Sequence, residues 1–112
     1  MAKTKYGLTI NELKTTLKSV AQPYKGSTKI GHALSKHAGR QGGEKIWGKI
    51  EGASKIWHDQ AMKHFRKIIR DTGQFQTVTD SKTGLSWIEK KSSDNRRAVR
   101  LNLDHTFKGF ID

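Results

Sequence analysis

The spacing of apolar residues changes once along the chain, at Gly73, and this change limits the possible folds more than any other feature of the sequence. Before Gly73 the apolar residues recur every three or four positions, and after it they alternate every second position. The first period is that of a helix with one buried face, and the second is that of a strand. Helices followed by strands predict an α+β fold, in which N-terminal helices pack on one face of a C-terminal antiparallel sheet of four strands.

Three helices are predicted before Gly73. The segment from Thr9 to Glu12 has the pattern of a capping box, and the helix that it opens ends before Pro23. A second, short helix begins at Ser27–Thr28 and ends at Gly39, and a long third helix ends at Gly73. The apolar stripes of these helices are Ile10, Leu13, Leu17 and Val20; Ile30, Ala33, Leu34 and His37; and Ala53, Ile56, Trp57, Ala61, Phe65, Ile68 and Ile69.

Four strands are predicted after Gly73, at residues 75–79, 85–90, 98–103 and 106–111, with turns at 81–84, 92–95 and 104–105. Strict alternation assigns Val99, Leu101 and Leu103 to one face of the third strand and Ala98, Arg100 and Asn102 to the other. In the last strand it separates Phe107, Gly109 and Ile111 from Thr106, Lys108 and Phe110. We therefore expect a polar face that contains Arg100, Thr106 and Lys108, for which an ordinary solvated sheet face is the alternative.

The charge of the chain indicates a polyanionic partner. Lysine and arginine number 22 against 10 acidic residues, a net charge of +12 in 112 residues, and such an excess favours phosphate backbones. A merely soluble basic domain is the alternative. The length suits a single domain, residues 1–112, which we divide into an N-terminal helical extension at 1–26 and a core at 27–112. The absence of cysteine excludes a thiol nucleophile and a disulfide framework, and we expect no membrane span.

Histidines surrounded by cations are the chemical groups that the sequence offers. The ten carboxylates are scattered rather than clustered as two-metal nucleases require, so we expect no metal site and no cofactor. Histidine, lysine and arginine are the residues that RNA transesterification uses to move protons and to stabilise a phosphorane. In residues 31–40, His32 and Lys36 share a helical face, while His37 lies on the apolar stripe and should point toward the sheet. A histidine that merely satisfies the core is the alternative for His37.

Two segments resemble a family of bacterial toxins. The stretch GHALSKHAGR, followed by a long helix and then by RAVRLNLDHTFKGFID, resembles the C-terminal toxin domains of contact-dependent inhibition and Rhs polymorphic toxins. These segments are also similar to colicin D-like nucleases of the barnase, EndoU, colicin and RelE superfamily. The resemblance covers residues 30–112 and leaves the helix at 9–22 outside. It implies a secreted or cell-surface toxin whose tip cleaves transfer RNA in the target cytoplasm, without a metal, and leaves a 2′,3′-cyclic phosphate.

The resemblance also implies roles for individual residues. His37 corresponds to the catalytic histidine and Lys36 to the lysine that assists it, while the last strand supplies a supporting hydroxyl or base-stacking group. This chain has Lys108 where the colicin D-like pattern has serine, so the second catalytic group stays open. The predicted catalytic set is His32, Lys36, His37, Thr106 and Lys108, and the predicted RNA-binding set is Arg40, Arg96, Arg97, Arg100 and Phe110.

Partners and rival functions follow from the same features. A strongly basic toxin predicts an acidic immunity protein that covers His37, and a host factor such as an elongation factor could take part. The rival function is a non-catalytic nucleic-acid-binding module, with Trp47, Trp57 or Trp87 stacking on bases. A DNA-cleaving toxin is a third possibility, which the lack of a 2′-hydroxyl in DNA disfavours.

Overall fold

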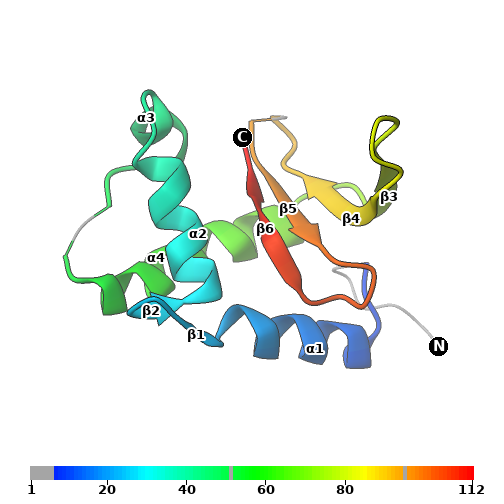
Figure 1. Ribbon diagram of the computed structural model, residues 1–112, viewed down its shortest axis with the longest axis horizontal. Coiled ribbons are helices and arrows are strands. Elements are labelled where there is room, and N and C mark those ends of the chain that lie inside the picture. The colour runs from blue at the N-terminus through cyan, green and yellow to red at the C-terminus, as the bar shows by residue number, and fades with distance from the viewer. Residues whose placement is uncertain (1–6, 51, 95) are drawn as a thin grey trace.

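The computed structural model describes residues 7–50, 52–94 and 96–112 and confirms the α+β fold (Figure 1). Residues 1–6, which begin the predicted extension, and Asn95, in a predicted turn, lie outside the described residues. The elements, in chain order, are α1 (Ile10–Val20), β1 (Pro23–Tyr24), β2 (Ser27–Thr28), α2 (Lys29–Ala38), α3 (Gly43–Trp47), α4 (Ser54–Arg70), β3 (Gln76–Thr79), β4 (Ser86–Lys91), β5 (Ala98–Leu101) and β6 (Phe107–Ile111).

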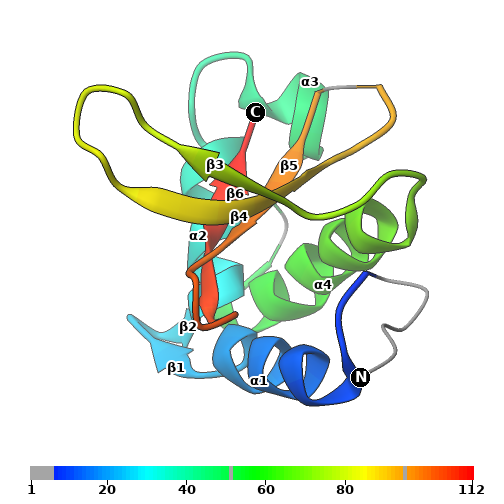
Figure 2. The ribbon, with the colours of Figure 1, turned by 90° about the vertical axis from the view of Figure 1, so that its right-hand side faces the viewer.

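The four predicted strands form one antiparallel sheet in the order β3-β4-β5-β6. Helices α2 and α4 pack against each other, α2 contacts β6, α4 contacts β4 and β5, and α1 lies across the end of β6 (Figure 2). The core between these layers is built largely from side chains of α2, α4, β5 and β6, among them Leu34, Phe65, Leu101 and Phe107. Within the described part of the chain, no helix is long and apolar enough to cross a membrane.

Helix α1 begins where the sequence predicts and packs Leu13 and Val20 of the predicted apolar stripe on the core, but not the other two residues. Thr9 and Glu12 form the capping box, with the Thr9 hydroxyl accepting from the Glu12 backbone N–H and the Glu12 carboxylate accepting from that of Thr9. The prediction that Ile10 and Leu17 face the core is wrong, because these side chains are 60% and 41% exposed. The buried side chains include Thr16 and Ser19, which bond to the backbone where β5 turns into β6.

Helices α2 and α4 approach each other closely because α2 carries a glycine at the contact. A Cβ atom at Gly31 would clash with Oγ of Ser27 and would press on the backbone of His58 in α4. The Thr28 hydroxyl caps α2 by accepting from the Gly31 backbone N–H at 3.2 Å, and Gly39 ends the helix as predicted. Helix α4 ends at Arg70, three residues before the predicted stop at Gly73.

Two elements have no counterpart in the prediction. The two-residue strands β1 and β2 pair as a small hairpin, and α3 occupies the segment before Trp47, where the apolar period is indistinct. A Cβ atom at Gly43 would clash with the carbonyl oxygen of His37. Glycine therefore lets α3 lie directly against the end of α2, which sets the position of Trp47.

An extra residue in β6 breaks the predicted alternation of its two faces. Arg100 pairs with Gly109 and Leu101 pairs with Phe107, so Lys108 is a bulge without a partner in this register. Phe107 and Phe110 are consequently both buried although they are three residues apart. The assignment of Phe110 to the polar face is wrong for this reason. The assignment of Leu103 to the core face is also wrong, because β5 ends at Leu101 and Leu103 is exposed.

Candidate active site between α2 and β6

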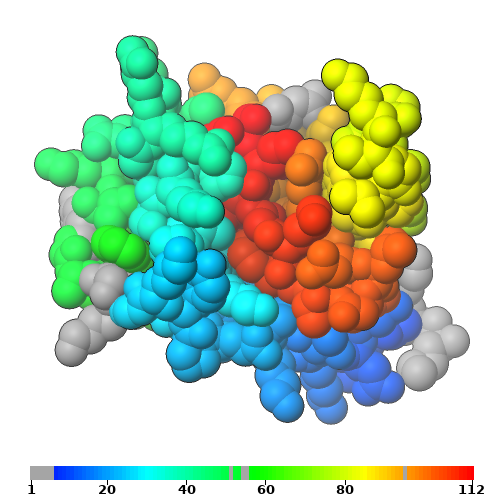
Figure 3. All heavy atoms as spheres, viewed as in Figure 1, coloured from blue at the N-terminus to red at the C-terminus, as the bar shows by residue number. Residues whose placement is uncertain are grey.

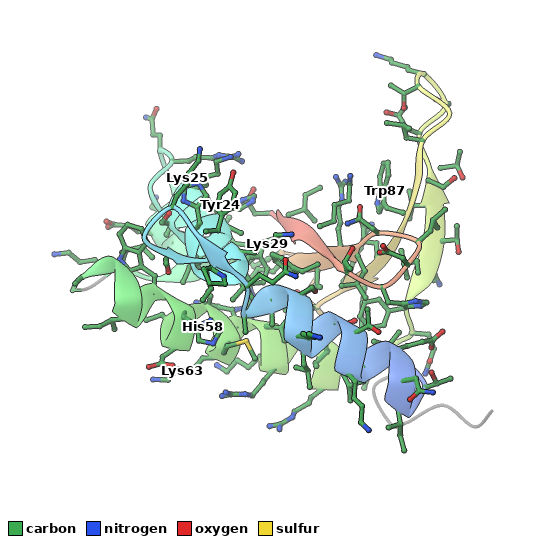
Figure 4. All side chains as sticks on the ribbon, turned by 60° about the horizontal axis from the view of Figure 1, so that its bottom comes forward. Tyr24, Lys25, Lys29, His58, Lys63 and Trp87 are labelled. Atoms are coloured by element: carbon green, nitrogen blue, oxygen red, sulfur yellow. The ribbon has the colours of Figure 1, made fainter. Side chains whose placement is uncertain are left out.

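Helix α2 and strand β6 border a cleft of about 390 Å³ that gathers most of the predicted catalytic residues. Atoms of α2 and β6 lie side by side on the face shown in Figure 3. The predicted residues that line the cleft are His32, Lys36, His37, Arg40, Lys108 and Phe110. Tyr24 and Lys29 line it as well, and Figure 4 shows them on the same side of the molecule.

His37 is held in place by the carboxylate of Asp112. Its Nδ1 lies 3.3 Å from Oδ2 of Asp112, and the same oxygen accepts a 2.8 Å hydrogen bond from Nε1 of Trp47. The His37 and Trp47 rings are also in contact, with centroids 5.6 Å apart. A histidine whose Nδ1 is bonded to a carboxylate keeps Nε2 for a proton transfer, which is the arrangement of an oriented general base. The predicted orientation of His37 toward the sheet is confirmed.

The charge of Asp112 is retained although its carboxylate is partly buried. Burial by itself raises the pKa of this carboxyl group, but the hydrogen bonds from Trp47 and His37 outweigh it and lower the pKa below its ordinary value. The nearby guanidinium of Arg40 acts in the same direction. Asp112 is therefore an anion at neutral pH and can stabilise an imidazolium at His37.

His32 brings a second imidazole to the cleft. Its ring contacts the edge of Tyr24, with centroids 5.0 Å apart. Burial, followed by the charges of Lys25 and Lys36, lowers the pKa of His32 below its ordinary value. Its Nε2 is buried and has no hydrogen-bond partner among the described residues. At neutral pH His32 is thus an uncharged imidazole with hydrogen-bonding capacity in reserve.

The cations of the cleft occupy its rim, above an aromatic floor. Lys36, Arg40 and Lys108 are exposed, and Nζ of Lys108 also lies 6.0 Å from the ring centre of Trp87 on the outer face of the sheet. Phe110 is only 5% exposed and contacts Trp47, with ring centroids 4.9 Å apart. Phe110 therefore belongs to the floor and offers no open face for base stacking, which corrects that part of the prediction.

The remaining predicted residues lie outside the cleft. Arg96, Arg97 and Arg100 line a neighbouring hollow of about 270 Å³ that Asp112 also borders. The Arg100 guanidinium donates to the Glu89 carboxylate at 2.8 Å, so part of its charge is neutralised. The Thr106 hydroxyl donates to the Asp104 carboxylate at 2.6 Å within the β5–β6 turn. The structure thus gives Thr106 a role in the turn and does not bring it to His37.

The sequence analysis missed Asp112, and it named Trp47 only for base stacking and not for its contact with Asp112 and His37. Both act through contacts between distant segments: 65 residues separate the two, and 75 separate Asp112 from His37. The available signals were weak, namely a tryptophan soon after a pair of glycines and an acid directly after the last predicted strand. Of the three tryptophans proposed for base stacking, Trp47 is buried and Trp57 is half-buried, whereas Trp87 lies on the outer face of the sheet beneath Arg100.

Among residues 7–50, 52–94 and 96–112, no group of three or more His, Asp or Glu side chains is arranged to hold a metal ion.

Comparisons with known proteins agree on one family. A family model described as the CdiA C-terminal tRNase toxin domain matches residues 17–112. The match begins inside α1, so the last part of the helix that the resemblance left outside is included. A crystal structure of the toxic C-terminal tip of CdiA from Pseudomonas aeruginosa, in complex with an immune protein, is 55% identical. The alignment covers 85% of this chain and 99% of that one, with a TM-score of 0.77. A search among curated proteins found no match.

Proposed function

Because the chain belongs to the CdiA C-terminal tRNase toxin domain family, whose members are toxin endoribonucleases acting on tRNA, we propose that it cuts tRNA without a metal ion. The reaction is attack of a ribose 2′-hydroxyl on the adjacent phosphate. The bond from phosphorus to the 5′-oxygen breaks, which leaves a 2′,3′-cyclic phosphate on one fragment and a 5′-hydroxyl on the other. The observation that carries the proposal is His37, oriented by Asp112, in a cleft whose rim is cationic.

We assign to His37 the role of the general base, which removes the proton from the 2′-hydroxyl. Nδ1 of His37 faces Asp112, so Nε2 accepts the proton, and the carboxylate stabilises the imidazolium that forms. The ammonium groups of Lys36 and Lys108 stabilise the phosphorane, and one of them protonates the departing 5′-oxygen. His32 is uncharged and forms part of the cleft wall, with its buried Nε2 turned away from the open cleft. Arg40, with Arg96 and Arg97 in the adjoining hollow, holds flanking phosphates.

Delivery and protection follow from family membership and charge. We propose that the domain is the end of a larger toxin at the surface of the producing cell and acts in the cytoplasm of the target. The CdiA tip from Pseudomonas aeruginosa was crystallised with an immune protein. A net charge of +12 suits an acidic immunity protein that covers the cleft of this chain by charge complementarity. If cleavage requires added cell extract, a host factor such as an elongation factor takes part in the reaction.

The test is cleavage of bulk bacterial tRNA in EDTA by the wild-type chain and by His37→Gln. General acid–base catalysis is worth about 10²- to 10⁴-fold, so we expect at least a hundredfold slower cleavage by the variant. The products should carry cyclic phosphate, and DNA of the same sequence should stay intact. Lys36→Gln should reduce the rate more than Lys18→Gln, a matched control on α1.

Several results would contradict the mechanism. One is cleavage that stops in EDTA and returns with Mg²⁺, and another is a folded His37→Gln protein that cleaves at the wild-type rate. If the wild-type chain and every variant leave the tRNA intact, both alone and with added cell extract, the result would favour the non-catalytic binding module instead.

A further inference from the structure

A second basic hollow lies along α4, outside the proposed catalytic cleft. Its volume is about 710 Å³, larger than that of the cleft. Five cations line it: Lys49 from the segment after α3, and Lys63, Arg66, Lys67 and Arg70 from α4. Figure 4 shows Lys63 on the other side of α4 from Tyr24 and Lys29. The catalytic mechanism uses none of these cations.

The spacing of these cations makes a charged row rather than scattered charges. Helix α4 supplies four of the cations: Lys63, Arg66, Lys67 and Arg70. The last three follow Lys63 by three, four and seven residues, so all four share one face of the helix and extend roughly 10 Å along its axis. Lys63, Arg66 and Lys67 are exposed. Such a row fits a ligand with several successive negative charges better than it fits a single anion.

One acid, Asp71, lines the hollow among the described residues. Its two carboxylate oxygens accept from the backbone N–H groups of Thr72 and Ser93, at 2.8 and 2.9 Å. These bonds hold the carboxylate at the end of α4. The lining of the hollow thus combines five cations with one carboxylate, which gives it an excess of positive charge.

The hollow is connected to the catalytic groups through Trp47. Trp47 lines the hollow, and its indole nitrogen donates to Asp112, which orients His37. His64 also lines the hollow and contacts the Arg97 guanidinium at 2.8 Å. Since Arg97 lines the phosphate-binding hollow beside Asp112, basic groups continue from that hollow, past Trp47 and His64, to α4.

We propose that the α4 hollow is a second RNA site that holds phosphates of the tRNA outside the segment that is cut. This inference rests on tRNA being the substrate of the proposed function. A tRNA is far larger than the catalytic cleft, and its flanking phosphates are a ligand with successive charges. The site would contribute affinity that depends on salt and would leave the chemistry at His37 to the cleft.

The test compares two triple variants with the same change in net charge. Lys63→Gln, Arg66→Gln and Lys67→Gln together neutralise the α4 row. Lys14→Gln, Lys18→Gln and Lys82→Gln neutralise exposed lysines on α1 and on the β3–β4 turn. Binding of bulk tRNA is measured at several salt concentrations in the His37→Gln background, with thermal melting to confirm folding.

We expect the α4 triple to weaken tRNA binding about tenfold at physiological salt and to reduce the slope of log K against log salt by about 2 to 3. The control triple should change the affinity less than twofold. Equal effects of the two triples would overturn the proposal. An unchanged tRNA affinity combined with lost binding of an acidic immunity protein would also overturn it and would assign the hollow to that partner.

The two proposals fail in different ways. The tRNA is recovered from each binding mixture and examined on a gel. Cleavage by the His37→Gln protein would contradict the proposed role of His37, whereas the comparison of initial binding between the two triples would still decide whether the α4 hollow binds RNA.

Discussion

Asp112→Asn is the change that tests most directly whether His37 works as an oriented base. The substitution keeps the shape of the side chain, and the amide oxygen can still accept from Trp47, so the fold should be kept. At 3.3 Å a full ion pair is worth about 5 kcal/mol at an effective dielectric constant of about 20. Desolvation of the partly buried groups offsets much of this, and the net value of a charged hydrogen bond is about 1.5–3 kcal/mol. The cleavage rate should therefore fall about ten- to a hundredfold.

The assay is single-turnover cleavage of tRNA in EDTA by Asp112→Asn, His37→Gln and the double variant. Asp59→Asn, an exposed acid on α4, is the matched control and should keep the wild-type rate. If Asp112 acts through His37, adding Asp112→Asn to His37→Gln should cost no further rate. A wild-type rate for Asp112→Asn, or an equal loss in both backgrounds, would refute the reasoning.

Three further changes test other contacts. Trp47→Phe keeps the aromatic floor but removes the hydrogen bond to Asp112, so single-turnover cleavage should slow about two- to tenfold, less than for Asp112→Asn. Burial, and after it the charge of Arg97, lowers the pKa of His64 below 6.5 in the folded protein. The neutral His64 imidazole therefore contributes fully to stability above about pH 6.5, and this contribution is lost as the pH falls through the lower pKa of the folded state. Melting curves from pH 7 to 5 should show a shallower loss for His64→Gln than for the wild type. Lys90 is buried and donates to the backbone carbonyl of Ile69 at the end of α4; Lys90→Met leaves that carbonyl unpaired and should lower the free energy of unfolding by about 1–3 kcal/mol in urea titrations.

The sequence predicted the parts of the fold that local rules determine. Thr9, Thr28 and Gly39 mark helix ends because capping depends on residues within one turn. The change of period at Gly73 located all four strands, because a half-buried strand needs alternation whatever its partner is. Helix α3 was not predicted, because its five residues are too few to show the helical period of apolar residues.

The missed parts depend on contacts between distant segments. The apolar stripe of α1 was only half right: Leu13 and Val20 pack on the core, but Ile10 and Leu17 do not. Thr16 and Ser19, which look unsuited to a core, are buried because they bond to the β5–β6 turn. His37 and its cationic neighbours lie within one short segment and could be read together, whereas Asp112 joins them only after β6 has paired with β5. Trp47 likewise joins only after α3 has packed on α2.

The bulge at Lys108 explains how one short strand serves both the core and the proposed site. Strict alternation would have turned Lys108 and Phe110 to the same side, with a phenylalanine in water. The extra residue instead buries Phe107 and Phe110 together and leaves Lys108 exposed at the rim of the cleft. Phe110 then contacts Trp47 beneath His37. An apolar floor of this kind excludes water and lowers the local dielectric constant, so cations at the rim act more strongly on a phosphorane than they would in open solvent. Since Trp47 also lines the α4 hollow, one side chain both bonds to the carboxylate that orients His37 and forms part of the wall of the second basic site.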